Sequence, residues 1–311
     1  FLWGLMKGRI LKILKEKESV ISGETIGSRL GISRVSVFKH IQNLREYGYE
    51  ILSTPSGYRF IGEPDILLPW GFPGRVDQIH YFQKLPSTMD VARELARNNC
   101  PHFTVVIAET QTQGRGRLKR IWHSSKGGLF FTIVLRPDLP LTKSFQINLA
   151  ASLILAKTLC SKFGIEARLK WPNDILINGK KVAGMLSEIQ GEAESLTYIN
   201  VGLGINVNND ISPLEDLAVS IKSLLGRSIS RQKLLSEYLD ALENRLNEGR
   251  FDRIITEWKA LSATISKPVR IETLRETTKG IAEDIDEDGA LILRLKNGST
   301  KRILYGDCFH R

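Results

Sequence analysis

The chain has 311 residues, of which 42% are hydrophobic and 25% charged, and its formal net charge is +10. This length predicts two or three domains, and the ordinary composition excludes a largely disordered chain. Apolar runs such as residues 147–156 are too short to span a bilayer, and the N-terminus lacks the layout of a signal peptide. We therefore expect a cytoplasmic protein whose charge suits a polyanionic partner such as nucleic acid or a nucleotide.

The cysteine pattern points to a reducing compartment. Cys100, Cys160 and Cys308 are widely spaced and odd in number, and the chain has no C-x-x-C motif. This pattern supports neither a disulfide framework nor a structural zinc site, and we expect no dedicated protein metal site.

The first 60 residues predict three short helices followed by a hairpin. Apolar periodicity indicates a helix over residues 6–17, a second helix that follows Ser22 and ends at Gly31, and a third helix capped by Ser33. Two β-rich runs around a turn at residues 55–57 complete the pattern. This order of elements is typical of a winged helix-turn-helix domain, which we assign to residues 1–65.

The third helix is the predicted DNA-reading element, because such a helix lies in the major groove with its first residues at the base edges. Residues 1–64 hold ten Lys and Arg against six Asp and Glu. A solvated basic face is the simpler alternative, but the complete order of elements favours DNA binding. The residues expected at the DNA are Ser33, Arg34, Ser36, Lys39, His40, Gln42, Asn43 and Arg45.

Residues 62–74 hold three prolines and three glycines and predict a linker. From about residue 79 onward, strand and helix patterns mix, which predicts a central mixed-sheet α/β domain over residues 66–267. The expected strands are 78–83, 104–109, 127–137, 166–179, 180–190 and 197–208, and the expected helices are 88–99, 143–163, 216–225 and 231–262. The tail, residues 268–311, consists of short strands with a turn at 286–289 and predicts a small SH3-like β-barrel. The predicted fold class is α+β.

Residues 114–122, GRGRLKRIW, place four cations and a tryptophan in nine positions. Like charges this close repel one another, so we expect a loop that is mobile until it binds an anion. Lys119 stands where a G-x-G-x-x-G dinucleotide fingerprint needs a small residue, and the P-loop pattern is absent. We therefore expect anion binding through guanidinium side chains, which contact phosphate or carboxylate bidentately.

Five motifs in one order carry a family resemblance: STMD (87–90), AETQTQGRGRLKRIW (108–122), KWPND (170–174), KKVAGMLSE (180–188) and GLGINVN (202–208). Together they resemble the biotin–protein ligase family, and the winged helix ahead of them points to its bifunctional ligase and repressor form. The resemblance covers about residues 7–308. Five motifs in register are specific, whereas any single one is weak.

The resemblance implies a two-step reaction with ATP and biotin as substrates and Mg²⁺ as cofactor. The biotin carboxylate attacks the α-phosphate of ATP, which gives biotinyl-5′-AMP and pyrophosphate. A lysine of a biotin carboxyl carrier domain, as in acetyl-CoA carboxylase, then attacks the mixed anhydride. The bifunctional form further implies a homodimer that forms on adenylate binding, and repression of biotin genes at operator DNA.

The same resemblance implies a role for each matching residue. Lys181, Arg115, Arg117 and Arg120 are the expected catalytic cations. Ser87, Thr88 and Gln111 match positions that hydrogen-bond the ureido ring of biotin, Trp122 matches the aromatic side chain beside adenine, and Asn173 is expected near the phosphates and Mg²⁺. Expected to line the biotin and adenylate site as well are Met89, Gly114, Gly116, Gly184, Gly202, Gly204 and Asn206.

Plainer interpretations remain for several of these residues. Ser87 also suits a helix N-cap, Asn173 and Asp174 suit a turn, and Lys181 suits a surface position at a strand end. Two residues depart from the family pattern: Lys119 replaces a glycine, and Met89 stands where a polar residue is common. The competing functions are a ligase whose winged helix no longer binds DNA, a lipoate-type ligase, and a biotin-sensing repressor without catalysis.

Overall fold

The computed structural model describes residues 2–16, 19–192, 195–212, 217–249, 251, 253–273 and 275–310. The chain divides into two compact units, residues 1–81 and 82–311, each described here by itself. Among the described helices, none is long and apolar enough to cross a membrane. Residues 17 and 216, where expected helices end and begin, lie outside the described residues, as does the side chain of Lys119.

The first unit contains the three expected helices, α1 (Leu2–Lys15), α2 (Gly23–Leu30) and α3 (Arg34–Glu46). The Ser22 and Ser33 side chains cap α2 and α3 by accepting hydrogen bonds from backbone N–H groups one turn later. Gly31 ends α2 in the left-handed conformation, with φ +66°. One apolar stripe from each helix forms the core, including Ile10, Ile26, Val37, Ile41 and Leu44.

The expected hairpin follows as β1 (Glu50–Thr54) and β2 (Gly57–Gly62), an antiparallel pair. Gly57 is required at its turn, because a Cβ there would lie 2.1 Å from the carbonyl oxygen of Ile21. This close approach joins the hairpin to the α1–α2 connection through the bridge between Ile21 and Tyr58. The unit therefore has the helix and wing order of the predicted domain.

The prediction of a linker over residues 62–74 is wrong in one respect, because this segment is packed. Leu67 is fully buried and Phe72 nearly so, and a short 3₁₀ turn, η1 (Pro69–Gly71), carries Trp70 onto the first unit. The Trp70 ring meets Tyr47 edge-on at 4.9 Å, and the Lys7 ammonium lies 4.5 Å from the Trp70 ring centroid. The apolar residues between the prolines are the sequence feature that indicates a packed segment.

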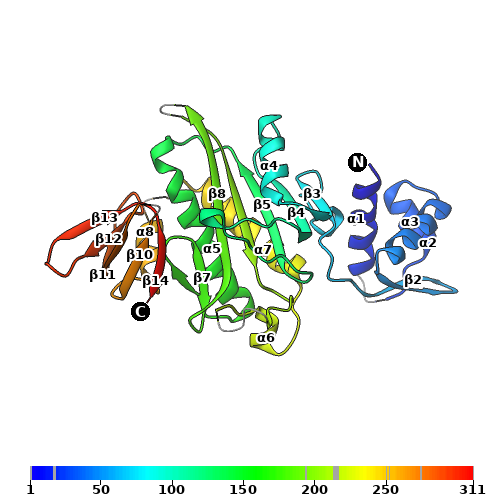
Figure 1. Cartoon of the computed structure of the whole chain (residues 1–311). Helices are drawn as coiled ribbons and strands as arrows, with labels where there is room; N and C mark the ends of the chain where they lie inside the picture. Colours follow the sequence, from blue (N-terminus) through cyan, green and yellow to red (C-terminus); the bar gives the residue numbers. More distant parts are fainter. Residues whose placement is uncertain are drawn as a thin grey trace. The chain divides into compact units, whose positions relative to one another are not determined.

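The second unit is built on a seven-stranded sheet (Figure 1). Its strands, in spatial order, are β3 (Ile79–Leu85), β4 (Thr104–Gln111), β5 (Leu129–Leu135), β9 (Ser195–Ile205), β8 (Lys180–Glu192), β7 (Asp174–Ile177) and β6 (Arg168–Lys170). The pairs from β4 to β6 are antiparallel. Every residue of β5 is buried, which shows that both faces of the sheet are covered.

Helices cover the two faces of this sheet. On one face α4 (Thr88–Arg97) packs Ala92 and Ala96 against Val106 and Val134. On the other face lie α5 (Ser144–Phe163), α7 (Arg231–Asn247) and α8 (Ile254–Ala260). The helical pattern predicted over 231–262 is two helices, and the one predicted over 216–225 is confined to α6 (Ile221–Leu225).

The tail forms a five-stranded antiparallel sheet of β10 (Pro268–Glu272), β11 (Thr277–Ile285), β12 (Leu291–Arg294), β13 (Thr300–Ile303) and β14 (Asp307–His310). The turn expected at 286–289 is present, and its Gly289 carbonyl accepts a hydrogen bond from the buried Trp171 indole at 3.1 Å. At the C-terminal end of β14, the Thr264 hydroxyl and the His310 ring lie 3.1 Å apart. These contacts fix the small sheet against the large one, and this attachment carries β14 to the site described below.

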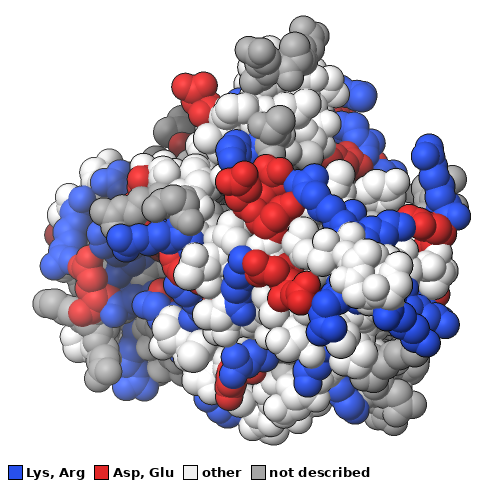
Figure 2. Space-filling model, turned by 90° about the vertical axis from the view of Figure 1, so that its left-hand side faces the viewer, with Lys and Arg blue, Asp and Glu red and all other residues white. Residues whose placement is uncertain are grey.

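Neither basic nor acidic side chains alone cover the side of the molecule on which the small sheet lies. Figure 2 shows basic and acidic side chains interspersed there. Arg302 pairs with Asp286 and Asp288 at 2.5 and 2.7 Å, and Lys301 pairs with Glu276 at 2.7 Å. Exposed pairs of this kind contribute little to stability, but they cancel charge locally.

Protonation of His310 is expected to loosen this attachment in acid. Burial is the main cause that lowers the pKa of His310 to about 4; Lys170 and Lys267 lower it further, whereas Asp174 raises it. An unfolded histidine titrates near 6.5, so between about pH 6.5 and pH 4 the unfolded chain binds more protons. The free energy of unfolding should therefore fall across this window as pH decreases.

Urea unfolding at several pH values should show a shallower fall in the free energy of unfolding for His310→Gln than for the wild-type chain. The exposed His123→Gln variant is the control, and equal pH slopes in both variants would contradict the prediction.

Candidate functional site

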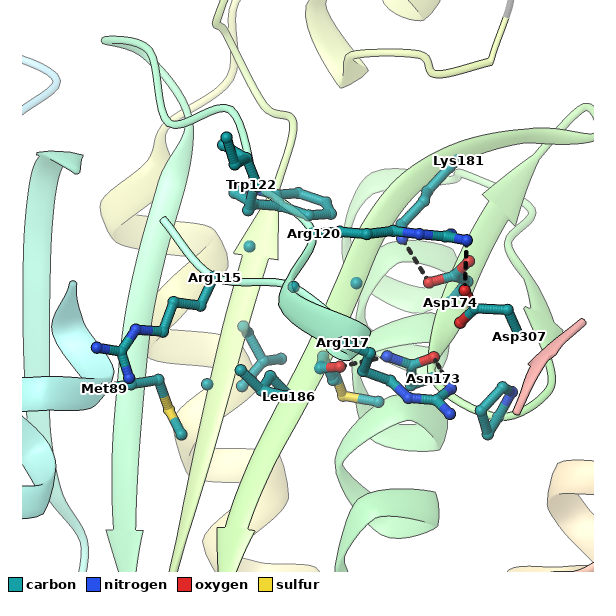
Figure 3. Close-up of a pocket in the computed structure, with 18 of the residues that line it drawn as sticks. Met89, Arg115, Arg117, Arg120, Trp122, Asn173, Asp174, Lys181, Leu186 and Asp307 are labelled. Atoms are coloured by element: carbon teal, nitrogen blue, oxygen red, sulfur yellow. Dashed lines mark hydrogen bonds and ion pairs between the residues drawn. The ribbon is translucent and has the colours of Figure 1, made fainter. Parts of the chain in front are cut away.

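A pocket with about 950 Å³ of space, part of it open to solvent, lies over the β8–β9 pair of the large sheet (Figure 3). The segment 114–122, called the cation loop here, and strand β14 form two of its walls. The structure brings together there most of the residues singled out in the sequence: Ser87, Thr88, Met89, Gln111, Arg115, Gly116, Arg117, Arg120, Trp122, Asn173, Lys181, Gly184, Gly202 and Gly204.

Three glycines form the floor of this pocket. Gly184 and Gly204 face each other on β8 and β9, and the Trp122 indole lies on both: a Cβ on Gly204 would lie 2.4 Å from the indole nitrogen. Met89 packs on Gly202 in the same way, since a Cβ there would lie 2.7 Å from its sulfur. Met89 therefore contributes an apolar wall, which explains how the pocket accepts a methionine where a polar residue was expected.

One end of the pocket carries a chain of neutral hydrogen-bonding groups. The backbone N–H and the hydroxyl of Thr88 donate to Gln111 Oε1 at 2.8 and 3.2 Å, and Gln111 Nε2 donates to Ser124 Oγ at 2.8 Å. Ser87 occupies the N-cap position of α4, but its side chain makes no capping bond. These fixed hydroxyl and amide groups suit a neutral polar ligand that both donates and accepts hydrogen bonds.

The guanidinium groups of the cation loop each have a separate acceptor in this structure. Arg115 pairs with Asp90 of α4 at 2.7 Å, and Arg120 pairs with Asp307 of β14 at 2.5 Å. Arg117 donates to Asn173 Oδ1 and to the Gly306 carbonyl, both at 3.0 Å. Acceptors from three distant elements thus separate the like charges. Figure 3 shows Arg115 beside Met89, away from Lys181 and Asp174.

Lys181 reaches the pocket because β8 contains a bulge. Residues 181 and 184 would lie on opposite faces of a regular strand. The β7–β8 register shifts by one residue between these positions, so that the Lys181 ammonium lies over Gly184, about 3.0 Å from where its Cβ would be. This ammonium pairs with Asp174 at 2.6 Å and lies 5.1 Å from the Trp122 ring centroid. Lys180 is exposed and does not line the pocket.

Among the loop cations whose side chains the structure describes, Arg117 is the most deeply placed. Burial lowers the pKa of its guanidinium, while Asp307 and Asp174 act in the opposite direction and Arg120 lowers it slightly. Among the described residues, the acceptors of this partly dehydrated charge are the neutral Asn173 Oδ1 and Gly306 carbonyl oxygen, so the charge is under-solvated. An anionic ligand beside Arg117 would therefore interact with it favourably.

Part of the pocket lining was not predicted from the sequence. Asp174 lay inside a quoted motif but had no assigned role, although it is the partner of Lys181. Asp307, Cys308 and Phe309 come from β14, and no sequence signal connects them with the cation loop. Burial raises the pKa of the Cys308 thiol to about 12, so it acts as an inert wall. The remaining unpredicted wall residues are Ile121, Lys170, Trp171, Pro172, Met185, Leu186 and Leu203.

Two predicted binding residues do not line the pocket. Gly114, the first residue of the cation loop, is buried, and a Cβ there would lie 2.3 Å from the Trp122 carbonyl oxygen. Asn206 is nearly buried, and its Oδ1 accepts a hydrogen bond from Asn209 at 3.2 Å. Both residues therefore support the pocket from outside in this structure.

The predicted DNA-facing surface of α3 needs correction at two positions. His40 is buried, because it lies on the inward stripe with Val37 and Ile41, and burial followed by the Lys7 charge lowers its pKa. Arg45 is engaged within the fold, since it donates to the Ile51 carbonyl at 2.9 Å. Of the other predicted positions, Ser33, Arg34 and Lys39 are exposed, Ser36, Gln42 and Asn43 are half-buried, and Asn43 donates to Glu46 at 3.0 Å.

Three parts of the chain match known families. Residues 81–206 match the Biotin/lipoate A/B protein ligase family, residues 264–311 match the Biotin protein ligase C terminal domain, and residues 8–59 match an HTH domain. The three matches fall in the order of the winged unit, the large sheet and the small sheet.

Whole-chain relatives give the same picture. The bifunctional ligase/repressor BirA of Bacillus subtilis is 39% identical over 296 residues, which cover 90% of this chain and 91% of that protein. The biotin–[acetyl-CoA-carboxylase] ligase of Paracoccus denitrificans is 35% identical over 199 residues, covering 61% of this chain and 83% of that protein. The Aquifex aeolicus biotin protein ligase, solved with biotin and ATP, is 28% identical with a TM-score of 0.64 and covers 75% of this chain and 98% of that chain.

Proposed function

Because this chain belongs to the family of bifunctional biotin protein ligases and repressors, we propose that its pocket joins biotin to AMP and that its winged unit binds operator DNA. One observation carries the ligase half: a single pocket combines a neutral hydrogen-bonding end with a cation-rich end. The neutral end, at Thr88 and Gln111, suits the ureido ring of biotin. The cationic end, at Lys181 and Arg117, suits its carboxylate and the phosphates of ATP.

The first step forms a mixed anhydride. A biotin carboxylate oxygen attacks the α-phosphorus of ATP, the bond between the α- and β-phosphates breaks, and pyrophosphate leaves. Two anions must approach each other, and the cations of Lys181, Arg117 and Arg120 offset their repulsion and stabilise charge that develops on the phosphate. Trp122, lying flat on its glycine floor, offers a face for the adenine ring.

Mg²⁺ would enter this site with the ATP phosphates. The described residues contain no group of three or more His, Cys, Asp or Glu side chains able to hold a metal ion by themselves. Asn173 and Asp174 nevertheless supply oxygen atoms beside the cations, and Mg²⁺ commonly takes one or two protein oxygens and completes its shell with phosphate and water. When bound, the ion would neutralise phosphate charge.

The second step transfers biotin to a protein. A neutral lysine amine of a carrier domain attacks the carbonyl carbon of biotinyl-5′-AMP, an amide bond forms, AMP leaves, and the amine loses a proton to solvent. The acceptor we propose is the biotin carboxyl carrier domain of a carboxylase, as the Paracoccus denitrificans relative is named for acetyl-CoA carboxylase. The need for ATP and this acceptor places the reaction in the cytoplasm.

Lys181→Ala is expected to lose most of the rate of biotinyl-5′-AMP formation, on the order of 10²–10³-fold, because it removes a cation from the reacting phosphate. The measurement is the rate of pyrophosphate release in single turnover. Lys180→Ala is the matched control, because this neighbouring lysine is exposed and outside the pocket lining. Equal rates in the two variants would show that Lys181 has no catalytic role.

Arg117→Gly is expected to form the adenylate but to release it early. The change removes a charge-assisted contact to the ligand and the contacts that hold the cation loop to Asn173 and Gly306. Escaped mixed anhydride should then biotinylate lysines of an unrelated protein added to the reaction. Lys126→Gly, at an exposed turn position outside the lining, is the control. Tight retention of adenylate by Arg117→Gly, without stray labelling, would contradict this role.

For the repressor half we propose that biotinyl-5′-AMP drives dimerisation. The ligand supplies a phosphate for which the loop arginines would exchange their present acceptors, such as Asp90 and Asp307. The resulting loop arrangement completes a dimer surface on the ligase unit, and a dimer presents two α3 helices to a two-fold operator. Because adenylate lasts only while acceptor lysines are scarce, the switch reports the demand for biotin.

Biotinyl-5′-AMP is therefore expected to convert monomer to dimer and to raise DNA affinity roughly 5–150-fold, the range that a coupling of about 1–3 kcal/mol gives. Sedimentation and gel shift, with and without adenylate, test this on DNA from the region upstream of the chain's own gene. Salt must be fixed, because Arg34 and Lys39 would contact phosphates. A protein that stays monomeric with adenylate, or binds DNA equally without it, would refute the repressor half and leave the ligase half intact.

A further inference from the structure

We infer that α3 recognises its DNA through the methyl groups of thymine, which Val35 and Phe38 contact in the major groove. This inference rests on the proposed function, because it names the chemistry that the winged unit would read in its operator. It begins from two side chains that the helical pattern does not explain: both are apolar, and both lie outside the core.

The exposure of these two residues is large for their type. Val35 is 64% exposed and Phe38 is 49% exposed, whereas the inward positions Val37, Ile41 and Leu44 of the same helix are fully buried. Exposing an apolar side chain of this size forgoes about 1.5–3 kcal/mol of burial. The core of the first unit includes neither residue, and both lie on the helix expected at the DNA, so a partner is the favoured source of the missing contact.

The partner favoured by the surroundings is polyanionic. Residues three and four apart are neighbours on a helix, so Arg34, Val35, Phe38 and Lys39 form one contiguous patch, called the α3 patch here. Among the described residues, no carboxylate pairs with Arg34 or Lys39, although Lys15 and Arg29 of the same unit each pair with a glutamate. Cations left without partners beside apolar groups fit DNA better than the apolar face of a second protein.

The position of the α3 patch fits base contact and not only phosphate contact. It begins at the first residue of α3 after its Ser33 cap, which is the end of a recognition helix that meets the base edges. In the major groove the only apolar group on a base edge is the 5-methyl of thymine, and apolar side chains contact it. Arg34 and Lys39 on either side would then hold the helix to the phosphates.

The test uses the full-length chain with biotinyl-5′-AMP and a duplex that the chain itself selects from a random-sequence library. Each thymine of that duplex is then replaced in turn by deoxyuridine, which removes the methyl group and keeps every hydrogen bond. We expect one or more positions at which the replacement weakens wild-type binding on the order of fourfold, the value for losing one buried carbon group. At those positions Val35→Ala or Phe38→Ala should bind the thymine and deoxyuridine duplexes equally well.

The controls keep the outcomes separate. Alanine suits a helix and both residues are exposed, so these variants should fold and should biotinylate a carrier domain at the wild-type rate. Val20→Ala, an exposed valine outside α3, should keep the full sensitivity to deoxyuridine. If the chain enriches a sequence but no thymine methyl matters, or if the variants keep the wild-type sensitivity, the inference is wrong although DNA binding stands. If no sequence is enriched, the DNA-binding proposal itself fails, and this inference fails with it.

Discussion

The pocket depends on a single electrostatic constraint: cations that must meet two anions have to be held together before those anions arrive. The fold meets this constraint by giving each cation an acceptor from a different element. Arg115 is held from α4, Lys181 from β7, and Arg120 from β14, so that no two of these cations share one carboxylate as their main partner.

The attachment of the small sheet to the large one serves the same arrangement, because Asp307 and the Gly306 carbonyl reach the cation loop only through that attachment. As proposed above, a ligand phosphate would then enter by exchange of partners, which costs less reorganisation than gathering free side chains would.

The glycine floor of the pocket positions Trp122 close to Lys181. Gly184 and Gly204 let the Trp122 indole lie against the sheet, where its ring is 5.1 Å from the Lys181 ammonium. The bulge in β8 completes the geometry, because without it the ammonium of Lys181 would be on the opposite face from Gly184. Backbone features thus decide which of two adjacent lysines becomes part of the site, although both have the same chemistry.

Local patterns in the sequence were sufficient for much of the fold and for the motif residues of the pocket. The capped helices of the winged unit are confirmed because Ser22, Gly31 and Ser33 act through their nearest neighbours. Most motif residues meet in one pocket, although they come from α4, the cation loop, the turn before β7 and the strands β8 and β9. The rest depends on contacts distant in sequence: β14 as a wall, Asp90 as the partner of Arg115, and the burial of His40 by the packing of α3. The mobility that charge repulsion predicts for the cation loop stays a prediction, and the acceptors of its arginines come from elements distant in sequence.

The two anion-binding surfaces of this chain handle positive charge in opposite ways, and each way fits its ligand. In the pocket, Arg115 and Arg120 are paired with carboxylates and Arg117 is partly withdrawn from water, so a ligand would need several well-placed acceptors to replace their present partners. On α3, Arg34 and Lys39 have no carboxylate partner among the described residues, so any polyanion can approach them and the attraction weakens with salt. Where these cations contact phosphates, they would supply affinity without sequence selectivity. Contacts to base edges would supply the selectivity, and Val35 and Phe38 are the exposed apolar side chains that the helix offers for such contacts between those two cations.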